Sequence, residues 1–325
     1  MSTSPQTDSS RTTLEILSQP ACWRRALDLV GPNSAALPRP GERVAVLGCG
    51  TSWFMAQAYA SLRESAGLGE TDAFAASEFP GARRYDRLVA ITRSGTTTEV
   101  LRALAHARGT TPTTALTADP ATPVMAAADE VVLLDFADEE SVVQTRFATT
   151  ALALLRGHLE TQGPLPAGVR TVAEAARDAE RALAAELPAA ILAAEQWTFL
   201  GAGWTNGLAQ EAGLKMREAA GAWTEAYPAM EYRHGPISIT GPNRVAWMFG
   251  SLPEGLAADI AAVGGVLVAQ SGSQPQTERG AEALDPMADL IRAQRLAVAL
   301  AYAADRDPDR PLNLTRSVVL DPVAG

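Results

Sequence analysis

The sequence contains very few cysteine and histidine residues. Only Cys22 and Cys49 occur, and the first 13 residues are polar, without the apolar stretch of a secretion signal. A disulfide framework is therefore excluded, and we expect a cytoplasmic protein. The three histidines, His106, His158 and His234, lie far apart, with no HExxH motif and no cysteine pair beside them. No metal site and no cofactor are predicted.

Long hydrophobic runs and an excess of basic charge are also absent. No stretch approaches 18 uncharged apolar residues, which excludes a membrane-spanning helix. Acidic residues number 37 against 27 basic ones, and the formal net charge is −10. This charge provides no basic field for a nucleic acid or an anionic membrane, so we expect neither as a partner. The 325 residues, 47% of them hydrophobic, predict two domains of ~150 residues.

Lysine is almost missing. One of the 27 basic residues is a lysine, Lys215, and the other 26 are arginine. Arginine keeps its proton in proteins, whereas lysine can lose it and shifts its pKa readily when buried. Lys215 is therefore a candidate for a role that only an ammonium or an amine can fill, the alternative being chance survival at an unimportant site.

Strand-like and helix-like stretches alternate along the chain, which is typical of a doubly wound parallel sheet. Residues 1–12 are expected to be a disordered tail, and residues 13–30 have helical apolar spacing interrupted at Pro20. Proline and glycine concentrate in 159–173 and indicate a linker. The remaining predicted elements are strands ending at Gly48, at 87–92, 113–118 and 130–135, and helices over 53–64, up to 108 and from about 141.

The segment 196–207 repeats the first strand and turn. VAVLGCGTS aligns with WTFLGAGWT at an offset of 153, which pairs Gly48 with Gly201 and Gly50 with Gly203. The same offset places residue 244 opposite Ile91, and no hydroxyl-rich loop follows there. We predict two tandem flavodoxin-like parallel-sheet domains with helical extensions at both ends: a tail and helix in 1–30, a first domain in 31–160, a linker and helix in 161–187, and a second domain with a C-terminal segment in 188–325.

Two loops of the first domain are rich in hydroxyls and glycine. Gly50, Thr51 and Ser52 follow one strand, and the run Thr92, Arg93, Ser94, Gly95, Thr96, Thr97 follows the next. Where a strand leads into a helix, backbone N–H groups and hydroxyls can bind a phosphate monoester, although the same residues are ordinary helix caps. A Walker A motif and a complete dinucleotide fingerprint are both absent.

The densest polar segment is EAGLKMREAAGAWTEAYPAMEYRHGP, 211–236. Glu211, Lys215 and Glu218 are four and three residues apart, so on a helix they share one face. A solvated salt-bridge ladder is the simple explanation. The solitary lysine and the nearby His234, followed by Gly-Pro, favour a functional site instead.

Six motifs in this order, over nearly the whole chain, resemble the double sugar isomerase (SIS) domain family: GCGTS, TRSGTTTE, EESVVQTR, EAGLKMRE, EYRHGP and DPDRPLNLTRSV. This family includes the isomerase half of glucosamine-6-phosphate synthase. The resemblance implies two flavodoxin-like domains, a bound sugar phosphate and a homodimer with shared active sites. It implies phosphate contacts from Thr51, Ser52, Thr92, Ser94 and Thr97, with Gln144 holding the sugar.

The resemblance also implies the catalytic roles. Glu218 matches the enediol base, and His234 matches the residue linked to ring opening and donated by the neighbouring subunit. Glu211 and Lys215 match positioning partners. Moving a carbonyl between C1 and C2 requires a carboxylate that lifts a proton and returns it to the adjacent carbon, and a nearby cation such as Lys215 stabilises the enediolate.

Two departures from the family limit the transfer of function. No glutaminase domain precedes the motifs, so we expect no glutamine-derived ammonia within this chain. The family's C-terminal lysine aligns with Arg316, which cannot form an imine. Isomerisation, or deamination coupled to it, is therefore favoured over amidotransfer. A fructosamine-phosphate deglycase, an ammonia-dependent aminotransferase-like enzyme and a non-catalytic sugar-phosphate-binding regulator stay open as alternatives.

Overall fold

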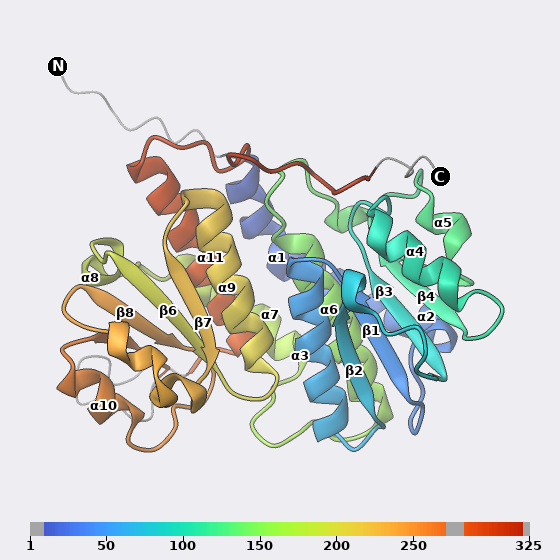
Figure 1. Cartoon of the computed structure of the whole chain (residues 1–325), viewed down its shortest axis with the longest axis horizontal. Coiled ribbons are helices and arrows are strands. Elements are labelled where there is room, and N and C mark those ends of the chain that lie inside the picture. The colour runs from blue at the N-terminus through green and yellow to red at the C-terminus, as the bar shows by residue number, and fades with distance from the viewer. Residues whose placement is uncertain (1–9, 271–282, 321–325) are drawn as a thin grey trace.

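The computed structural model describes residues 10–270 and 283–320 and contains two parallel sheets around a central layer of helices (Figure 1). The strands are β1 (Val44–Gly48), β2 (Thr71–Ala75), β3 (Arg87–Ile91), β4 (Thr113–Thr117), β5 (Glu130–Leu133), β6 (Gln196–Gly201), β7 (Thr224–Pro228), β8 (Arg244–Met248) and β9 (Val266–Val268). The helices are α1 (Arg11–Asp28), α2 (Val30–Asn33), α3 (Thr51–Ser65), α4 (Thr98–Ala107), α5 (Val124–Ala127), α6 (Arg146–Gln162), α7 (Val172–Ala184), α8 (Ala189–Leu192), α9 (Thr205–Ala220), α10 (Leu256–Ala262) and α11 (Pro286–Ala303). Within the described part of the chain, no helix has the length and apolarity needed to cross a membrane.

The first sheet has the strand order β2-β1-β3-β4-β5, all parallel, which is the doubly wound order predicted from the sequence. Its side chains alternate between two apolar clusters. Leu47, Leu88 and Ala90 pack with α4 on one face, whereas Val46 and Val89 on the other face join the central cluster. Because both faces are covered, the central strands β1, β3 and β4 are buried along their whole length, whereas the edge strands β2 and β5 are partly exposed.

The second sheet repeats this arrangement with four described strands in the order β7-β6-β8-β9. The offset of 153 holds for β1 and β6 but not for β3 and β8. Leu47 pairs with Ala90, and its counterpart Leu200 pairs with Met248. The counterpart of Ile91 is therefore the residue after Met248, and the alignment of residue 244 with Ile91 is wrong, because the second copy has five more residues between these strands. No hydroxyl-rich loop follows β8 in the corrected register either.

An approximate twofold relation links the two copies across the crossing of α3 and α9. Gln210 Nε2 donates to Gln57 Oε1 at 2.8 Å, and these residues are themselves 153 apart. An equivalent residue on each side therefore meets its own counterpart, as at an isologous interface. The helices approach closely at Gly207, where a Cβ would lie 2.4 Å from the Phe54 carbonyl oxygen. This crossing brings the polar face of α9 to the first sheet's loops.

Several predicted boundaries are wrong for identifiable reasons. The helix α1 begins at Arg11, capped by Ser10, so the predicted tail is shorter, and residues 1–9 of it lie outside the described residues. Pro20 does not interrupt α1. The Ile16 carbonyl, which would accept from the missing N–H of Pro20, accepts from Gln19 Nε2 at 3.2 Å instead.

The helices α6 and α7 also differ from their predicted ranges. Helix α6 runs to Gln162 and α7 begins at Val172 with a capping box from Thr171 to Glu174. The predicted linker is therefore reduced to residues 163–171. Helix α7 packs against α1 and α11 inside the central layer. The division into domains at 31–160 and 188–325 stays a prediction.

After α11, residues 305–320, called here the C-terminal segment, cross the top of the molecule toward α4 (Figure 1). Asp309 accepts from the N–H groups of Arg11 and Thr12 at 2.9 and 2.8 Å. Further along, the carbonyl of Val318 accepts from the Thr98 N–H at 3.2 Å. The segment has neither helix nor strand, and these bonds fix it over the carboxyl edge of the first sheet.

Candidate active site

One cavity of about 200 Å³ brings the predicted sugar-phosphate residues together. The loops after β1 and β3 form its floor, the segment before α6 forms a wall, and the C-terminal segment covers it. The predicted residues that line it are Gly50, Thr51, Ser52, Thr92, Arg93, Ser94, Thr97, Gln144, Glu218 and Arg316. Residues from five separate parts of the sequence therefore meet at one place.

The floor of the cavity has the geometry of an anion site. Gly50 has a φ of 54° and precedes α3, and Thr97 precedes α4, so two helices present their N-termini here. The Thr97 side chain makes no capping hydrogen bond and its hydroxyl is free for a ligand. Ser94 Oγ accepts from the Thr96 N–H at 3.3 Å, which shapes the turn between them.

The polar face of α9 lies at the side of this cavity. Lys215 Nζ is 3.6 Å from Glu211 Oε1 and makes a close ion pair with Glu218. The side chains of Lys215 and Glu211 are each 1% exposed, whereas that of Glu218 is 20% exposed and reaches the cavity. The solvated ladder is excluded by this burial. Glu218 is the member of the trio that a ligand can touch.

Burial sets the protonation states of this trio. Burial, and the charge of Glu218, raise the pKa of Glu211 to about 8 in spite of the opposing effect of Lys215. Burial acts to lower the pKa of Lys215, but the carboxylates of Glu211 and Glu218 outweigh it and the net shift is upward. At neutral pH the site therefore holds a protonated Glu211 and an ammonium on Lys215 that is paired with Glu218.

Two acceptors in the cavity wall lack donors. Gln144 Oε1 and Glu99 Oε2 are buried without a hydrogen-bond partner. Buried acceptors are normally paired, so these atoms indicate where a ligand with hydroxyl or amino groups would donate. Glu99 lies in the first turn of α4 and was missed from the sequence. The sequence could have indicated Glu99, because it is the last residue of the TRSGTTTE motif.

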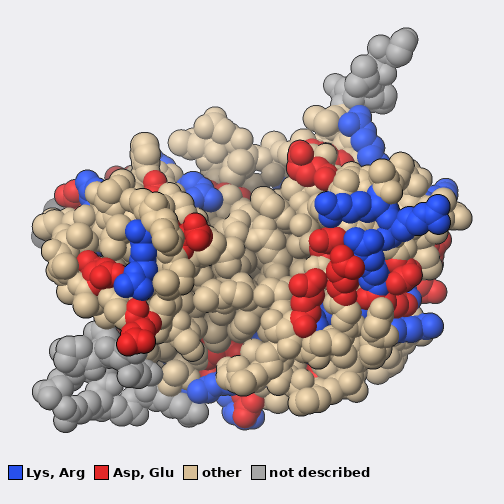
Figure 2. Space-filling view, turned by 60° about the horizontal axis from the view of Figure 1, so that its bottom comes forward, with Lys and Arg blue, Asp and Glu red and all other residues tan. Residues whose placement is uncertain are grey.

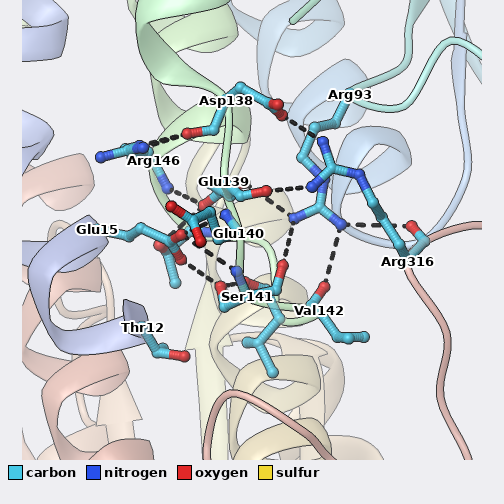
Figure 3. A network of polar contacts seen from close by, with 12 residues as sticks. Thr12, Glu15, Arg93, Asp138, Glu139, Glu140, Ser141, Val142, Arg146 and Arg316 are labelled. Carbon is cyan, nitrogen blue, oxygen red and sulfur yellow. Dashed lines mark hydrogen bonds and ion pairs between the residues drawn. The ribbon is translucent and has the colours of Figure 1, made fainter. Parts of the chain in front are cut away.

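The guanidinium of Arg93, which was predicted to contact the phosphate, is bound by oxygen atoms of the protein. Arg93 is 2% exposed, and its guanidinium donates to Glu139 Oε2 at 3.2 Å and to the carbonyls of Ser141 and Val142 (Figure 3). Arg316 is also engaged, since it donates to the carbonyl of Glu139 and to Asp138 Oδ1 at 2.5 Å. Both arginines line the cavity, and both guanidinium groups already donate to oxygen atoms of the protein.

Of the predicted catalytic residues, Glu218 lines this cavity, and Lys215 and Glu211 lie buried beside it without lining the cavity, whereas His234 lies elsewhere. It ends the 3-10 turn η4 (Glu231–His234) after β7, and it is exposed. It is absent from the lining of the cavity. Its role in a site shared between subunits stays a prediction.

A second cavity of about 460 Å³ lies on the other side of Glu218. The end of α9 and the start of the C-terminal segment enclose it, and its charged lining consists of Arg217, Glu218, Asp305, Arg306, Asp307 and Arg310. Arg306 Nη1 donates to the Ala220 carbonyl at 2.7 Å and so fixes the end of the helix that carries Glu218. Glu218 is the residue that lines both cavities.

The described residues offer no metal centre, since no three histidine, cysteine, aspartate or glutamate side chains among them gather as a ligand set. On the face shown in Figure 2, basic side chains lie beside acidic ones and the middle of the face is largely uncharged.

Comparisons with known proteins give relatives over most of the chain. No protein-family model matches it. It is 29% identical to the glutamine–fructose-6-phosphate aminotransferase [isomerizing] of Xanthomonas campestris pv. campestris over 90% of this chain and 54% of the relative. It is 28% identical to the enzyme of the same name from Zymomonas mobilis, over 89% of this chain and 55% of that protein. The chain spans about half the length of these aminotransferases.

Solved structures with the same fold cover nearly the whole chain. Glucosamine-6-phosphate deaminase from Thermotoga maritima has a TM-score of 0.75 and 23% identity, over 96% of this chain and all of that chain. Tagatose-6-phosphate ketose/aldose isomerase from Escherichia coli has a TM-score of 0.73 and 17% identity, over 97% and 99%. The predicted resemblance to the double sugar isomerase family is thereby confirmed: the chain is a relative of the isomerizing aminotransferases and has the fold of these phosphosugar enzymes.

Proposed function

We propose that the protein is a sugar-phosphate isomerase, or a deaminating isomerase, that acts on a ketose, aldose or amino-sugar 6-phosphate through an enediol intermediate. The observation that carries this proposal is that Glu218 lines the same cavity as the hydroxyl-rich loops. A phosphate at the N-termini of α3 and α4 leaves the sugar to extend toward α9. Gln144 and Glu99 are the acceptors for its hydroxyl or amino groups.

The chemistry follows from the protonation states of the trio. Glu218 removes the proton from the carbon next to the carbonyl and delivers it to the former carbonyl carbon. In the same conversion the proton of the neighbouring hydroxyl moves to the former carbonyl oxygen, so that the carbonyl and the hydroxyl exchange places. The Lys215 ammonium stabilises the negative charge of the enediolate. Glu211 is protonated at neutral pH, which leaves Glu218 as the partner of Lys215. Arg316, in place of lysine, directs the reaction away from an imine.

The test uses the sugar phosphates named for the related proteins and solved structures. Purified protein would be mixed with fructose 6-phosphate, tagatose 6-phosphate and glucosamine 6-phosphate, and followed first by thermal shift and then by product formation. Stabilisation and turnover of at least one of them supports an enzyme. Stabilisation without any turnover would support the sugar-phosphate-binding regulator, and no stabilisation by any of them would overturn the proposal.

The second cavity favours one further candidate. The second cavity, which shares Glu218 with the first and is lined by both arginine and carboxylate side chains, could hold an amine substituent of the sugar phosphate. This arrangement suits a fructosamine-phosphate deglycase or an ammonia-dependent aminotransferase-like enzyme. Release of sugar phosphate and amine from a fructosamine 6-phosphate, at a rate above that of isomerisation, would establish the deglycase instead.

We further infer a homodimer in which His234 of one subunit completes the site of the other. The exposure of His234 and its absence from its own chain's cavity support this arrangement. Its test is the subunit complementation described in the Discussion.

A further inference from the structure

A buried ion pair lies directly behind the cavity. Arg93 and Glu139 are joined at 3.2 Å, and their side chains are 1% and 0% exposed (Figure 3). The cost of removing two charges from water offsets much of their attraction, so a buried ion pair is weak evidence for stability alone. The role of this pair is therefore better judged from the parts of the cavity that the two side chains hold in place.

Glu139 holds the start of α6 and the segment before it. Its Oε1 accepts from the Thr145 N–H at 2.5 Å, the Thr145 hydroxyl at 3.0 Å and the Arg146 N–H at 2.7 Å. A carboxylate at a helix N-terminus fixes the backbone there. Gln144, which lines the cavity and has a buried oxygen without a hydrogen-bond partner, is the residue immediately before this anchor.

Arg93 binds both the segment before α6 and the C-terminal segment. Its guanidinium donates to the carbonyls of Ser141 at 3.1 Å and Val142 at 3.2 Å, and to the carbonyl of Arg316 at 3.3 Å. Arg316 belongs to the C-terminal segment, more than two hundred residues away in the sequence. Arg93 itself lies between Thr92 and Ser94 of the phosphate loop. One side chain therefore connects the floor, the Gln144 wall and the covering segment.

We propose that Arg93 and Glu139 are positioning residues for sugar-phosphate binding, which hold Gln144 and the C-terminal segment in a fixed relation to the phosphate loop. Both residues act through the groups that they hold in place. The identity of the bound molecule rests on the proposed function, whereas the coupling of the three walls rests on the contacts alone.

The chain offers a matched control for this pair. Arg156 and Asp285 form an ion pair at 2.8 Å with both side chains 0% exposed, and neither lines the cavity. Arg156 also stacks over the Trp204 ring at 4.9 Å. Breaking this pair removes an equally buried charge without touching the cavity walls.

The first experiment compares Glu139→Gln with Asp285→Asn in the full chain. The glutamine keeps the shape of Glu139 but turns a donor toward the guanidinium of Arg93. Both variants should melt earlier. Glu139→Gln should weaken glucosamine 6-phosphate binding and raise KM about 10-fold or more while kcat changes less than about threefold, and the control should keep both within about twofold. Affinity and KM as unaffected in Glu139→Gln as in the control would overturn the positioning role.

The second experiment does not depend on Glu139→Gln folding well. Trypsin can cleave the C-terminal segment after Arg306 and Arg316, since Arg310 is followed by proline. Arg93→Lys keeps the charge but cannot reach all three carbonyls. We expect faster cleavage after Arg316 in this variant, and loss of the protection that glucosamine 6-phosphate gives the wild type. Wild-type protein that binds no sugar phosphate would overturn the proposed function, whereas unchanged cleavage in Arg93→Lys would overturn the positioning role.

Discussion

The carboxyl of Glu211 and the ammonium of Lys215 face each other at 3.6 Å, and both are almost fully buried. The burial of this pair distinguishes a functional site from a solvent-exposed salt-bridge ladder. A surface Glu211 would be ionised at neutral pH, whereas burial raises its pKa to about 8. The proton that Glu211 keeps leaves Glu218 as the carboxylate that neutralises Lys215 and faces the cavity.

Glu211 should make the protein less stable as the pH rises from 6.5 to 8. Its pKa is about 8 in the folded protein and near 4.5 in the unfolded chain, so in this range the folded state holds a proton that the unfolded state has lost. The free energy of unfolding then falls by up to about 1.4 kcal/mol per pH unit. His158, whose pKa is lowered to about 4 by burial, is neutral in the folded state but about half protonated at pH 6.5 in the unfolded chain, so near pH 6.5 it opposes this slope. The comparison with a Glu211 variant cancels the contribution of His158, which both proteins share.

Glu211→Gln isolates this effect, because it mimics the protonated carboxyl. Urea unfolding at pH 6.5, 7.0, 7.5 and 8.0 should give a falling free energy of unfolding for the wild type relative to the variant. Parallel curves for the two proteins would show that Glu211 titrates normally.

The phosphate loop should be separable from helix stability. Replacing both Ser94 and Thr97 with alanine removes two donors from the helix N-terminus and should weaken sugar-phosphate binding by ~1 to 3 kcal/mol. The melting temperature should fall only by the loss of the Ser94 hydrogen bonds to Thr96, because the Thr97 hydroxyl does not cap α4. Calorimetric titration with the best-bound sugar phosphate measures the affinity.

Thr171 provides the opposite control. It caps α7 in a capping box, so Thr171→Ala should cost about 1 kcal/mol of stability and leave sugar-phosphate affinity unchanged. An unchanged affinity in the Ser94 and Thr97 double variant would place the phosphate elsewhere.

Lys215→Arg should strongly reduce the proposed activity although it keeps the charge. Lys215 is enclosed between two carboxylates, and a guanidinium is larger and planar, so turnover should fall by about tenfold or more and the melting temperature should drop. Arg24→Lys, at an ion pair with Glu180 that is about half exposed, is the matched control and should be neutral. Near-normal turnover in Lys215→Arg would mean that the single lysine has no special role.

Subunit mixing tests the shared site. If His234 acts in the partner's cavity, an inactive His234→Ala chain and an inactive Glu218→Gln chain should recover part of the activity when mixed, because some sites then combine intact residues from both. Size-exclusion chromatography with a tagged chain would confirm exchange of subunits. No recovery after confirmed exchange would contradict the shared site.

The local chemistry of the site was predictable from the sequence. Strand, turn and helix signals follow one another around Gly50 and Thr97, so the two loops could be placed at one sheet edge. The three- and four-residue spacing from Glu211 to Glu218 placed these side chains on one helix face. Both predictions depend on interactions within a few residues, which composition and spacing record directly.

The long-range contacts were not predictable in the same way. Arg93 looks like a phosphate ligand in its loop, and only the folded chain shows its guanidinium bound to Glu139 and to the Arg316 carbonyl. Pro20 looks like a helix break until the Gln19 side chain is seen to replace the lost hydrogen bond. In each case the deciding partner is set by packing or side-chain orientation rather than by a local pattern.

Isotope exchange with Glu218→Gln tests the central claim most directly. The variant keeps the shape of Glu218 but loses the base, which typically contributes ~10²- to 10⁴-fold to the rate. In deuterated water the wild type should introduce label at C1 or C2 of the sugar phosphate, and the variant should bind the sugar phosphate without introducing label. Undiminished exchange by Glu218→Gln would contradict the account, because the carboxylate at the cavity would then not be the group that moves the proton.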